Sequence, residues 1–430
     1  MAGEWKEVRL GELGEVNRGR SRHRPRNAPH LYGGEYPFIQ TGDIKASNGL
    51  ITAHSQTYSE AGLAQSRIWP ESTMVITIAA NIAETAILTY PACFPDSVVG
   101  FIADERKADV RFIEYLFRHL RRQIQHENVG TGSVQDNINL QTLDRLALRV
   151  PELPEQRAIA HILGTLDDKI ELNRRRNQTL EAMARALFKD WFVDFGPVRA
   201  KMDGQEPYLL ADLWQLLPDR LDDEGKPEGW EIQPLDQIAA LVTNSIAPGK
   251  TPKAVFEHYS IPAFDVGRMP AMEVGESIKS NKYIVDPDSV LVSKLNPQTQ
   301  RVWLPAVATD RAICSTEFMQ FVPHDRDNRS YLYCLMSSGT MQEVVLQHVT
   351  GSTGSRQRAQ PSQIAKVNIL TPSPSVVTAF NRQAGPILKA VGENQRESQT
   401  LAQLRDTLLP KLISGELRIK DTEKFMESVA

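Results

Sequence analysis

The chain has 430 residues, of which 41 % are hydrophobic and 24 % are charged, and its formal net charge is −4. This length predicts two or three domains with real cores, and no apolar run approaches the length of a membrane span. The negative charge excludes a protein that grips nucleic acid with its whole surface, so any DNA contact must come from local basic patches.

Residues 1–150 are predicted to form a mixed domain of short strands, turns and one helix. Runs of branched and apolar residues at Met74–Ile78 and Val98–Ile102 predict strands, and the spacing of apolar residues from Phe112 to Leu120 predicts a helix. The first ten residues contain no apolar signal core. We therefore expect a protein of the cytoplasm that has no contact with a membrane.

Three cysteines, Cys93, Cys314 and Cys334, are too few for a disulfide framework and lack the spacing of a zinc site. Cys93 and Cys314 lie in strand-like apolar surroundings, 221 residues apart. Cysteine is a small hydrophobe when it is buried. We predict that these residues fill the core and are not reactive thiols.

Arginines alternate with small or polar residues between Asn17 and Arg26, and no acidic residue interrupts this segment. A guanidinium group can fork onto phosphate oxygens, so this spacing suits a loop laid along a DNA backbone. The alternative is a solvated, disordered loop. The DNA-binding residues predicted here are Arg18, Arg20, Arg22, Arg24 and Arg26.

A turn rich in glycine and serine closes the first domain at Gly130–Asn137. Glycines let a backbone approach a partner closely, and Gln and Arg are the side chains that read adenine and guanine edges. A plain flexible hairpin is the alternative. We predict DNA contacts from Ser133, Gln135 and Asn137.

Residues 151–200 are predicted to form a long helix in which every seventh position is apolar, except for one asparagine. These seam positions are Ile159, Leu166, Asn173, Leu180 and Leu187, with companions at Leu163, Ile170, Met183 and Trp191. A seven-residue repeat is typical of a coiled coil, although an amphipathic helix packed on its own domain gives a similar pattern. A helix of about 40 residues is about 60 Å long, more than one domain can bury.

The second half repeats the first after a connector at 201–228, in which Leu209–Trp214 is predicted to be packed. Residues 229–371 are predicted to form a second domain, 372–417 a second long helix and 418–430 a tail. Trp230 corresponds to Trp5 at an offset of 225, and at the same offset Pro262 and Gly267 are predicted to correspond to Pro37 and Gly42. The predicted DNA-binding residues of this half are Lys250, Lys253, Ser355, Arg356, Gln357 and Arg358.

The second helix carries the same seam, and Pro386 inside it predicts a kink or a break. Its seam positions are Phe380, Ile387, Asn394, Leu401 and Leu408, with companions at Ala384, Val391, Leu404 and Leu412. Antiparallel pairing of the two helices keeps the connector short. Because a buried asparagine fixes register, we expect Asn173 to face Asn394.

Candidate enzyme motifs are weak. Pro248–Thr251 resembles the end of a phosphate loop, but its upstream glycine is missing. Asp96, Glu105 and Lys107 have the spacing of a metal-dependent nuclease, but Glu105 and Lys107 lie in a charged turn. Asn296–Thr299 lacks the sequence with which amino-methyltransferases hold a flipped base. We expect no catalytic site and no metal site.

The whole chain resembles the specificity subunit of type I restriction-modification systems. The segments that carry this resemblance are Leu153–Ala160, Leu166–Glu171, Leu187–Phe192, Leu404–Glu416 and the turns at Gly130 and Gly351. One departure is Pro374–Val377, where the first copy has Pro154–Gln156. Specificity subunits of this family assemble with two modification subunits, so the resemblance implies that these two need not dock on this chain in the same way.

The resemblance implies an α+β fold in which two target-recognition domains are separated by a pair of long antiparallel helices. It implies binding of double-stranded DNA at a bipartite site, with each half-site read by one domain. It also implies two modification subunits that use S-adenosylmethionine and restriction subunits that use ATP and magnesium, with no cofactor in this chain. The alternatives are a single-chain restriction or methylation enzyme with a nuclease site at 95–107, and a protein adaptor that never touches DNA.

Overall fold

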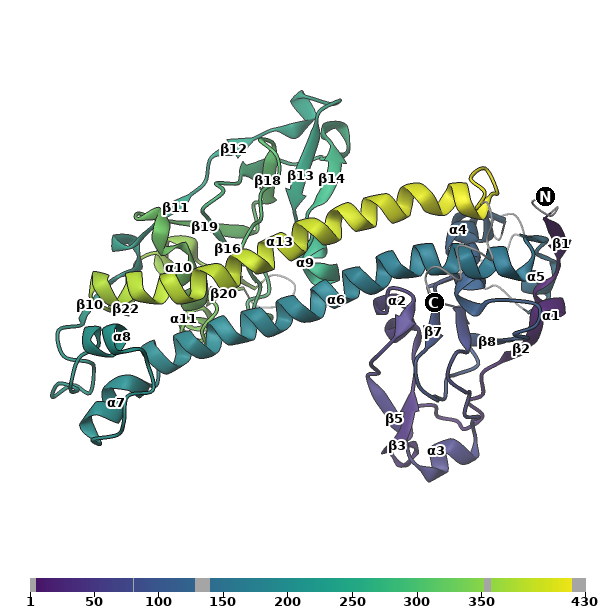
Figure 1. Cartoon of the computed structure of the whole chain (residues 1–430), viewed down its shortest axis with the longest axis horizontal. Helices are drawn as coiled ribbons and strands as arrows, with labels where there is room; N and C mark the ends of the chain where they lie inside the picture. Colours follow the sequence, from purple (N-terminus) through teal and green to yellow (C-terminus); the bar gives the residue numbers. More distant parts are fainter. Residues whose placement is uncertain (1–4, 80, 128–139, 352–356, 420–430) are drawn as a thin grey trace. The chain divides into compact units, whose positions relative to one another are not determined.

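The computed structural model describes residues 5–79, 81–127, 140–351 and 357–419 (Figure 1). By its internal contacts the chain divides into two units, one made of residues 1–168 and 401–430 and the other of residues 169–400. Two long helices, α6 (Leu153–Phe192) and α13 (Pro374–Ile413), each contribute one part to each unit.

The first unit is built on a five-stranded sheet. In order across the sheet, its strands are β2 (Gly14–Arg18), β8 (Val98–Ala103), β6 (Met74–Thr77), β7 (Thr85–Leu88) and β4 (Leu50–Ile51). The predicted strands at Met74 and Val98 are thus confirmed, and they pair antiparallel with Met74 opposite Phe101. All residues of β6 and β7 are buried, which explains their continuous apolar runs.

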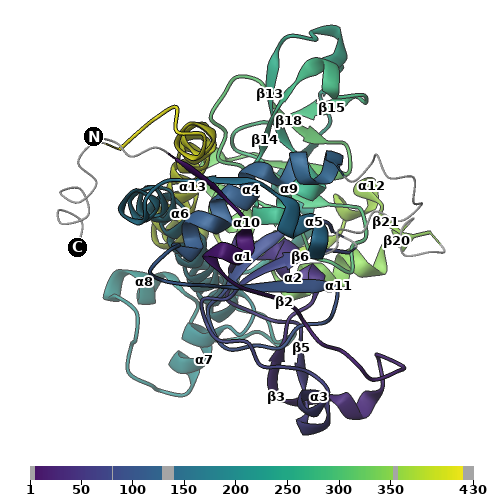
Figure 2. The same cartoon turned by 90° about the vertical axis from the view of Figure 1, so that its right-hand side faces the viewer.

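A smaller layer of the first unit holds the two-stranded sheet of β3 (Tyr32–Phe38) and β5 (Gln56–Tyr58). Beside it lie the 3-10 turn η1 (Pro29–Leu31) and helix α3 (Glu60–Ala64), whereas helix α2 (Thr41–Ala46) contacts β6 and β7. Both views place β3, β5 and α3 together (Figures 1 and 2). A bridge between Phe38 and Cys93 ties this layer to the rest of the unit.

Helix α4 (Val110–Glu127) confirms the helix predicted after the sheet, and it packs its apolar face into the core of the first unit. Short elements complete the unit: α1 (Leu10–Leu13), α5 (Leu140–Arg145), and β1 (Lys6–Val8) paired with β9 (Leu148–Val150). The same core contains Ile159 and Leu163 of α6 and Leu409 and Leu412 of α13.

The second unit has two main sheets. One contains β11 (Ala239–Val242), β19 (Phe318–Pro323), β16 (Val290–Ser293) and β17 (Val302–Trp303). The other contains β12 (Ser245–Ile246), β15 (Lys282–Ile284), β18 (Ala312–Ser315), β13 (Val255–Tyr259) and β14 (Ala271–Val274). Two-stranded pairs join β10 (Glu231–Pro234) to β22 (Asn368–Thr371), and β20 (Val349–Thr350) to β21 (Arg358–Ala359).

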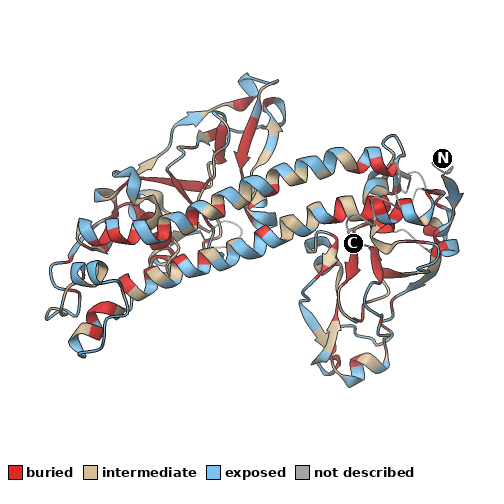
Figure 3. Cartoon of the chain, viewed as in Figure 1, coloured by how far each residue is buried: buried red, intermediate tan, exposed pale blue. Residues whose placement is uncertain are grey.

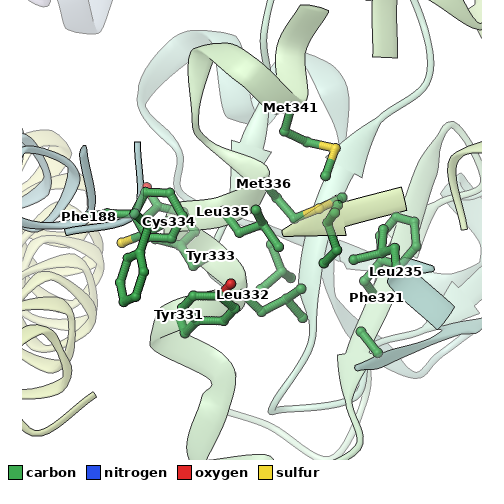
Figure 4. Close-up of a cluster of buried hydrophobic side chains, with 14 of the residues drawn as sticks. Phe188, Leu235, Phe321, Tyr331, Leu332, Tyr333, Cys334, Leu335, Met336 and Met341 are labelled. Atoms are coloured by element: carbon green, nitrogen blue, oxygen red, sulfur yellow. The ribbon is translucent and has the colours of Figure 1, made fainter. Parts of the chain in front are cut away.

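The second unit also contains the helices α7 (Gly196–Met202), α8 (Ala211–Leu216), α9 (Ile261–Gly267), α10 (Arg329–Met336), α11 (Gly339–Gln347) and α12 (Pro361–Ile364). Helix α10 contacts β16, β17 and β19 and shares a core with both long helices. Figure 4 shows the buried side chains of α10 between Phe188 of α6 on one side and Leu235 and Phe321 on the other. In the connector, Leu209 and Leu213 pack against this core, whereas Leu210 is exposed.

The main sheets of the two units share a strand order, β2-β8-β6-β7 and β11-β19-β16-β17, but two predicted residue correspondences are wrong. Trp5 precedes β1 as Trp230 precedes β10, which keeps the offset of 225. The bridge between Phe38 and Cys93 recurs between Tyr259 and Cys314, which sets the offset here at 221. Pro37 lies in β3 and Gly42 in the first turn of α2, whereas Pro262 lies in the first turn of α9 and Gly267 ends it, so these pairs are not equivalent. Loop deletions before the strand cause the shift.

The parts of α6 and α13 pack antiparallel within each unit, which confirms the predicted fold class. In the second unit Phe188 contacts Phe380 while Asn177 contacts Val391, and in the first unit Asp167 contacts Arg405. Figure 3 shows buried, half-buried and exposed residues alternating along both helices.

Two predicted companion positions of the seam are wrong, because Met183 is 52 % exposed and Leu404 is 46 % exposed. A straight helix has 3.6 residues per turn and drifts against a strict seven-residue repeat. Ala184, next to Met183, is buried instead, and the next buried residue after Leu404 is Leu409. The helix does not break at Pro386, since α13 continues through this exposed residue as one helix.

The three cysteines are free and buried, as predicted. Burial raises the pKa of the Cys314 and Cys334 thiols to about 12 and raises the pKa of Cys93 as well. Thiols held in this neutral form are poor nucleophiles. Within the described residues, no helix is both long and apolar enough to cross a bilayer.

Candidate nucleic-acid interface

The arginine-rich segment is a fixed loop and not the disordered one considered as the alternative. Its backbone is held by the carbonyl oxygens of Val98 and Phe94, which accept from the amides of Gly19 at 2.9 Å and Arg20 at 3.2 Å. A Cβ atom at Gly19 would lie 2.3 Å from the Pro95 carbonyl oxygen, so only glycine lets the loop approach this closely.

Asp96 lies against this loop, a contact that the uninterrupted run of arginines did not predict. Its carboxylate accepts from Arg26 at 2.8 Å and lies 3.8 Å from Arg24, and its carbonyl oxygen accepts from Arg18 at 3.0 Å. Because Asp96 is 70 residues away in the chain, local spacing could not reveal it. Arg20 and Arg22 are exposed, and no side-chain partner is seen for either among the described residues.

The lysines predicted in the second unit lie in the corresponding place after β12. Lys250 ends the 3-10 turn η4 (Pro248–Lys250) and Lys253 follows it, and both side chains are exposed. The turn contacts a second one, η5 (Gly275–Ser277), and the Gly275 amide donates to the carbonyl oxygen of Ala254, four residues after η4, at 2.8 Å. The segment resembling a phosphate loop is therefore a short 3-10 turn.

The glycine- and serine-rich turns are only partly described. Ser133, Gln135, Asn137, Ser355 and Arg356 lie outside the described residues. Gln357 and Arg358 lie next to the hairpin that joins β16 to β17: the Gln357 carbonyl oxygen accepts from the Asn296 amide at 3.1 Å. Arg358 contacts the Glu317 carboxylate at 3.0 Å.

Polar side chains meet within the helix pair of the second unit, with partners that differ from the predicted ones. Asn173 is buried and its amide donates to Glu397 at 2.7 Å and to Ser398 at 3.3 Å. Asn394 donates to Asn177 at 2.8 Å, so the amides of Asn173 and Asn394 do not pair with each other. The Asn173 amide also donates to the Asn394 carbonyl oxygen at 3.5 Å, so the two residues face each other as expected although their side-chain amides do not pair.

Comparisons with known proteins agree with this architecture. A family described as the type I restriction modification DNA specificity domain matches residues 2–182. The chain is 27 % identical to the type I restriction enzyme HindI specificity subunit of Haemophilus influenzae, over 96 % of this chain and 100 % of that protein. It is 25 % identical to the MjaIX specificity subunit of Methanocaldococcus jannaschii, over 97 % of this chain and 94 % of that one. The chain belongs to the type I restriction-modification specificity subunits.

The fold agrees with this assignment. A crystal structure of a type I S subunit from M. genitalium superposes with a TM-score of 0.56 over 95 % of this chain and 96 % of that chain, at 13 % identity. Subunits of this family are non-catalytic components that confer DNA specificity.

The residues of the considered nuclease site do not converge in this specificity subunit. Asp96 is engaged by the arginines of the loop, while Glu105 lies in an exposed turn after β8. No group of three or more metal-binding side chains is found among the residues that the structure describes.

The seam residues of the specificity subunit are all at least half-buried. Ile159, Asn173 and Phe380 are buried. The half-buried positions are Leu166, Leu180, Leu187, Ile387, Asn394, Leu401 and Leu408. Phe188 and Leu388 are more deeply buried than the predicted positions 187 and 387 beside them. The drift of a straight helix against the seven-residue repeat, which exposes Met183, explains this difference.

An ion network in the first unit was not predicted, although two of its members lie in family segments. Asp167 of α6 accepts from Arg405 of α13 at 2.6 Å, from the Tyr115 hydroxyl at 2.7 Å and from Arg118 at 3.2 Å. Arg118 also binds Glu114, whose pKa is raised by burial, with Arg118 opposing the shift. The network fastens α4 of the sheet domain to both helices.

Proposed function

We propose that this specificity subunit binds a bipartite DNA target, with one half-site read by each mixed domain. The observation that carries this proposal is the duplicated architecture, in which the Phe38–Cys93 and Tyr259–Cys314 bridges occupy the same place in the two copies. Two similar domains joined by antiparallel helices match the local dyad of a DNA duplex. The helix pair would then set the length of the unread spacer.

The proposed partners follow from membership of the family. Two modification subunits would supply adenine methylation with S-adenosylmethionine, and restriction subunits would supply ATP- and magnesium-dependent translocation and cleavage. This chain would hold none of these cofactors and would act on DNA in the cytoplasm of a prokaryote. Its departure at Pro374–Val377 from Pro154–Gln156 suggests unequal docking of the two modification subunits.

Footprinting of the full chain in complex with its modification subunits tests the proposal. We expect two protected blocks about one helical turn apart, separated by bases whose identity does not matter. A single continuous block of specified bases would overturn the bipartite reading. Unchanged binding after replacing Arg20, Arg22 and Arg24 by glutamate would instead favour the adaptor that never touches DNA.

Arg20 and Arg22 are expected to carry the phosphate contacts of the arginine loop, because the carboxylate of Asp96 already binds two other arginines, Arg24 and Arg26. Replacing both by alanine should weaken binding equally for all DNA sequences. The slope of log K against log [salt] should become less steep by up to about two. The matched control is the Arg24→Ala, Arg26→Ala pair, for which we expect a smaller change in slope. Equal slopes for the two double variants would contradict this assignment.

A further inference from the structure

The loop of the hairpin between β16 and β17 has exposed polar side chains at its tip and buried residues at its base. Gln298, Thr299 and Gln300 are exposed at its tip, whereas Pro297 before them is buried. At the base, Arg301 is bound by both oxygens of Asp265, at 2.6 and 2.9 Å. The tip is therefore held out from the domain by anchored residues on both sides.

Hydrogen bonds fix the conformation of this loop. The Gln342 side chain of α11 donates to the Pro297 carbonyl oxygen at 2.6 Å, and the Thr299 amide donates to the Asn296 carbonyl oxygen at 3.0 Å. Asn296 itself has a φ of +47°, a left-handed conformation that asparagine tolerates better than most residues. A reading element needs such preorganisation, because an ordered loop loses less entropy on binding.

The surroundings of the hairpin suit an approach by DNA. The Asn296 amide joins it to Gln357, and a bridge joins Leu295 to Arg358 of the glycine-rich turn. The nearby carboxylates of Asp265 and Glu317 are each engaged by an arginine, which offsets their repulsion of phosphates.

The first unit contains the same brace on a different tip. There Gln125 of α4 donates to the Ile82 carbonyl oxygen at 2.9 Å, in the hairpin between β6 and β7. A helix glutamine thus supports the equivalent hairpin in both units, while the supported segments differ: Asn81–Ala83 in one and Pro297–Thr299 in the other. Two domains that recognise different half-sites need a common hairpin conformation with different residues at the tip, and this arrangement provides both.

We propose that Gln298 at the tip of the β16–β17 hairpin is a specificity-determining residue that reads an adenine in the second half-site. A glutamine amide can donate to N7 and accept from the N6 amino group of adenine in the major groove. This inference rests on the proposed bipartite function. It assigns the base contact to the hairpin and leaves phosphate contacts to the basic loops.

The test is selection of bound duplexes from a library in which both half-sites are randomised, using the full chain with its modification subunits. Gln298→Ala should lower the preference for adenine at one position of the second half-site by about ten- to a hundredfold. Gln298→Glu should move the preference at that position toward cytosine, whose amino group donates to a carboxylate. The first half-site and the spacer should be unchanged.

Gln347→Ala is the matched control, because Gln347 is an exposed glutamine of the same unit that lies on α11 and not on the hairpin. It should select the wild-type site. Unchanged selection by both Gln298 variants, or a loss of affinity that is equal for all sequences, would overturn the inference while the bipartite function stands. Selection of one continuous site by the wild-type complex would instead refute the proposed function itself.

Discussion

Replacing Asp167 by alanine is expected to destabilise the first unit by about 3 kcal/mol. Its carboxylate is the shared acceptor for Arg118, Arg405 and the Tyr115 hydroxyl, and its side chain is only 15 % exposed. Removing it leaves two partly buried guanidinium groups without this counter-charge, which costs more than the net energy of an exposed pair. Urea denaturation of the chain, followed by tryptophan fluorescence, measures the change.

Asp168→Ala is the matched control for this variant. The Asp168 side chain is 54 % exposed and pairs with Arg111 at 2.6 Å, so its loss should cost less than about 1 kcal/mol. Equal losses for the two neighbouring aspartates would show that the network on Asp167 contributes no more than a surface ion pair.

Phe380→Ala is expected to destabilise the second unit by about 3 to 5 kcal/mol. The Phe380 ring is fully buried and contacts Phe188, Trp191 and Phe192 of α6 as well as Tyr331 of α10. A cavity at this place would loosen both the helix pair and the helix that supports the sheet. Differential scanning calorimetry should show a lower melting temperature for the transition of this unit.

Met183→Ala serves as the control for the core variant, because Met183 lies on the same helix pair but is 52 % exposed. Its effect should stay within about 0.5 kcal/mol. A comparable loss of stability from both variants would mean that the buried aromatic cluster does not hold the unit together.

The elements with strong periodicity could be predicted from the sequence. The seven-residue spacing predicts both long helices, and the apolar runs predict β6 and β8, because burial on a helix or strand face imposes that period. The internal repeat predicts two similar domains. The exposed Met183 and Leu404 mark where this reasoning fails, since seam position drifts along a straight helix.

The partners of polar side chains could not be predicted in the same way. Asn173 pairs with Glu397 and Ser398, because the stagger of antiparallel helices is set by packing along their whole length. Asp96 reaches the arginine loop across 70 residues of sequence. Such contacts depend on the tertiary fold, so the candidate DNA site was predicted as a set of loops and not as a set of contacts.

Lengthening both helices tests the central claim, that two half-site readers are separated by a helical spacer. Duplicating Lys169–Arg175 in α6 and Asn394–Thr400 in α13 inserts one heptad into each helix and repeats the contacts between Lys169, Asn173 and Glu397. Seven residues add about 10 Å, which corresponds to about three base pairs. Selection of duplexes by the variant complex should return both half-sites unchanged with a spacer longer by about three base pairs; altered half-sites with an unchanged spacer would contradict the account.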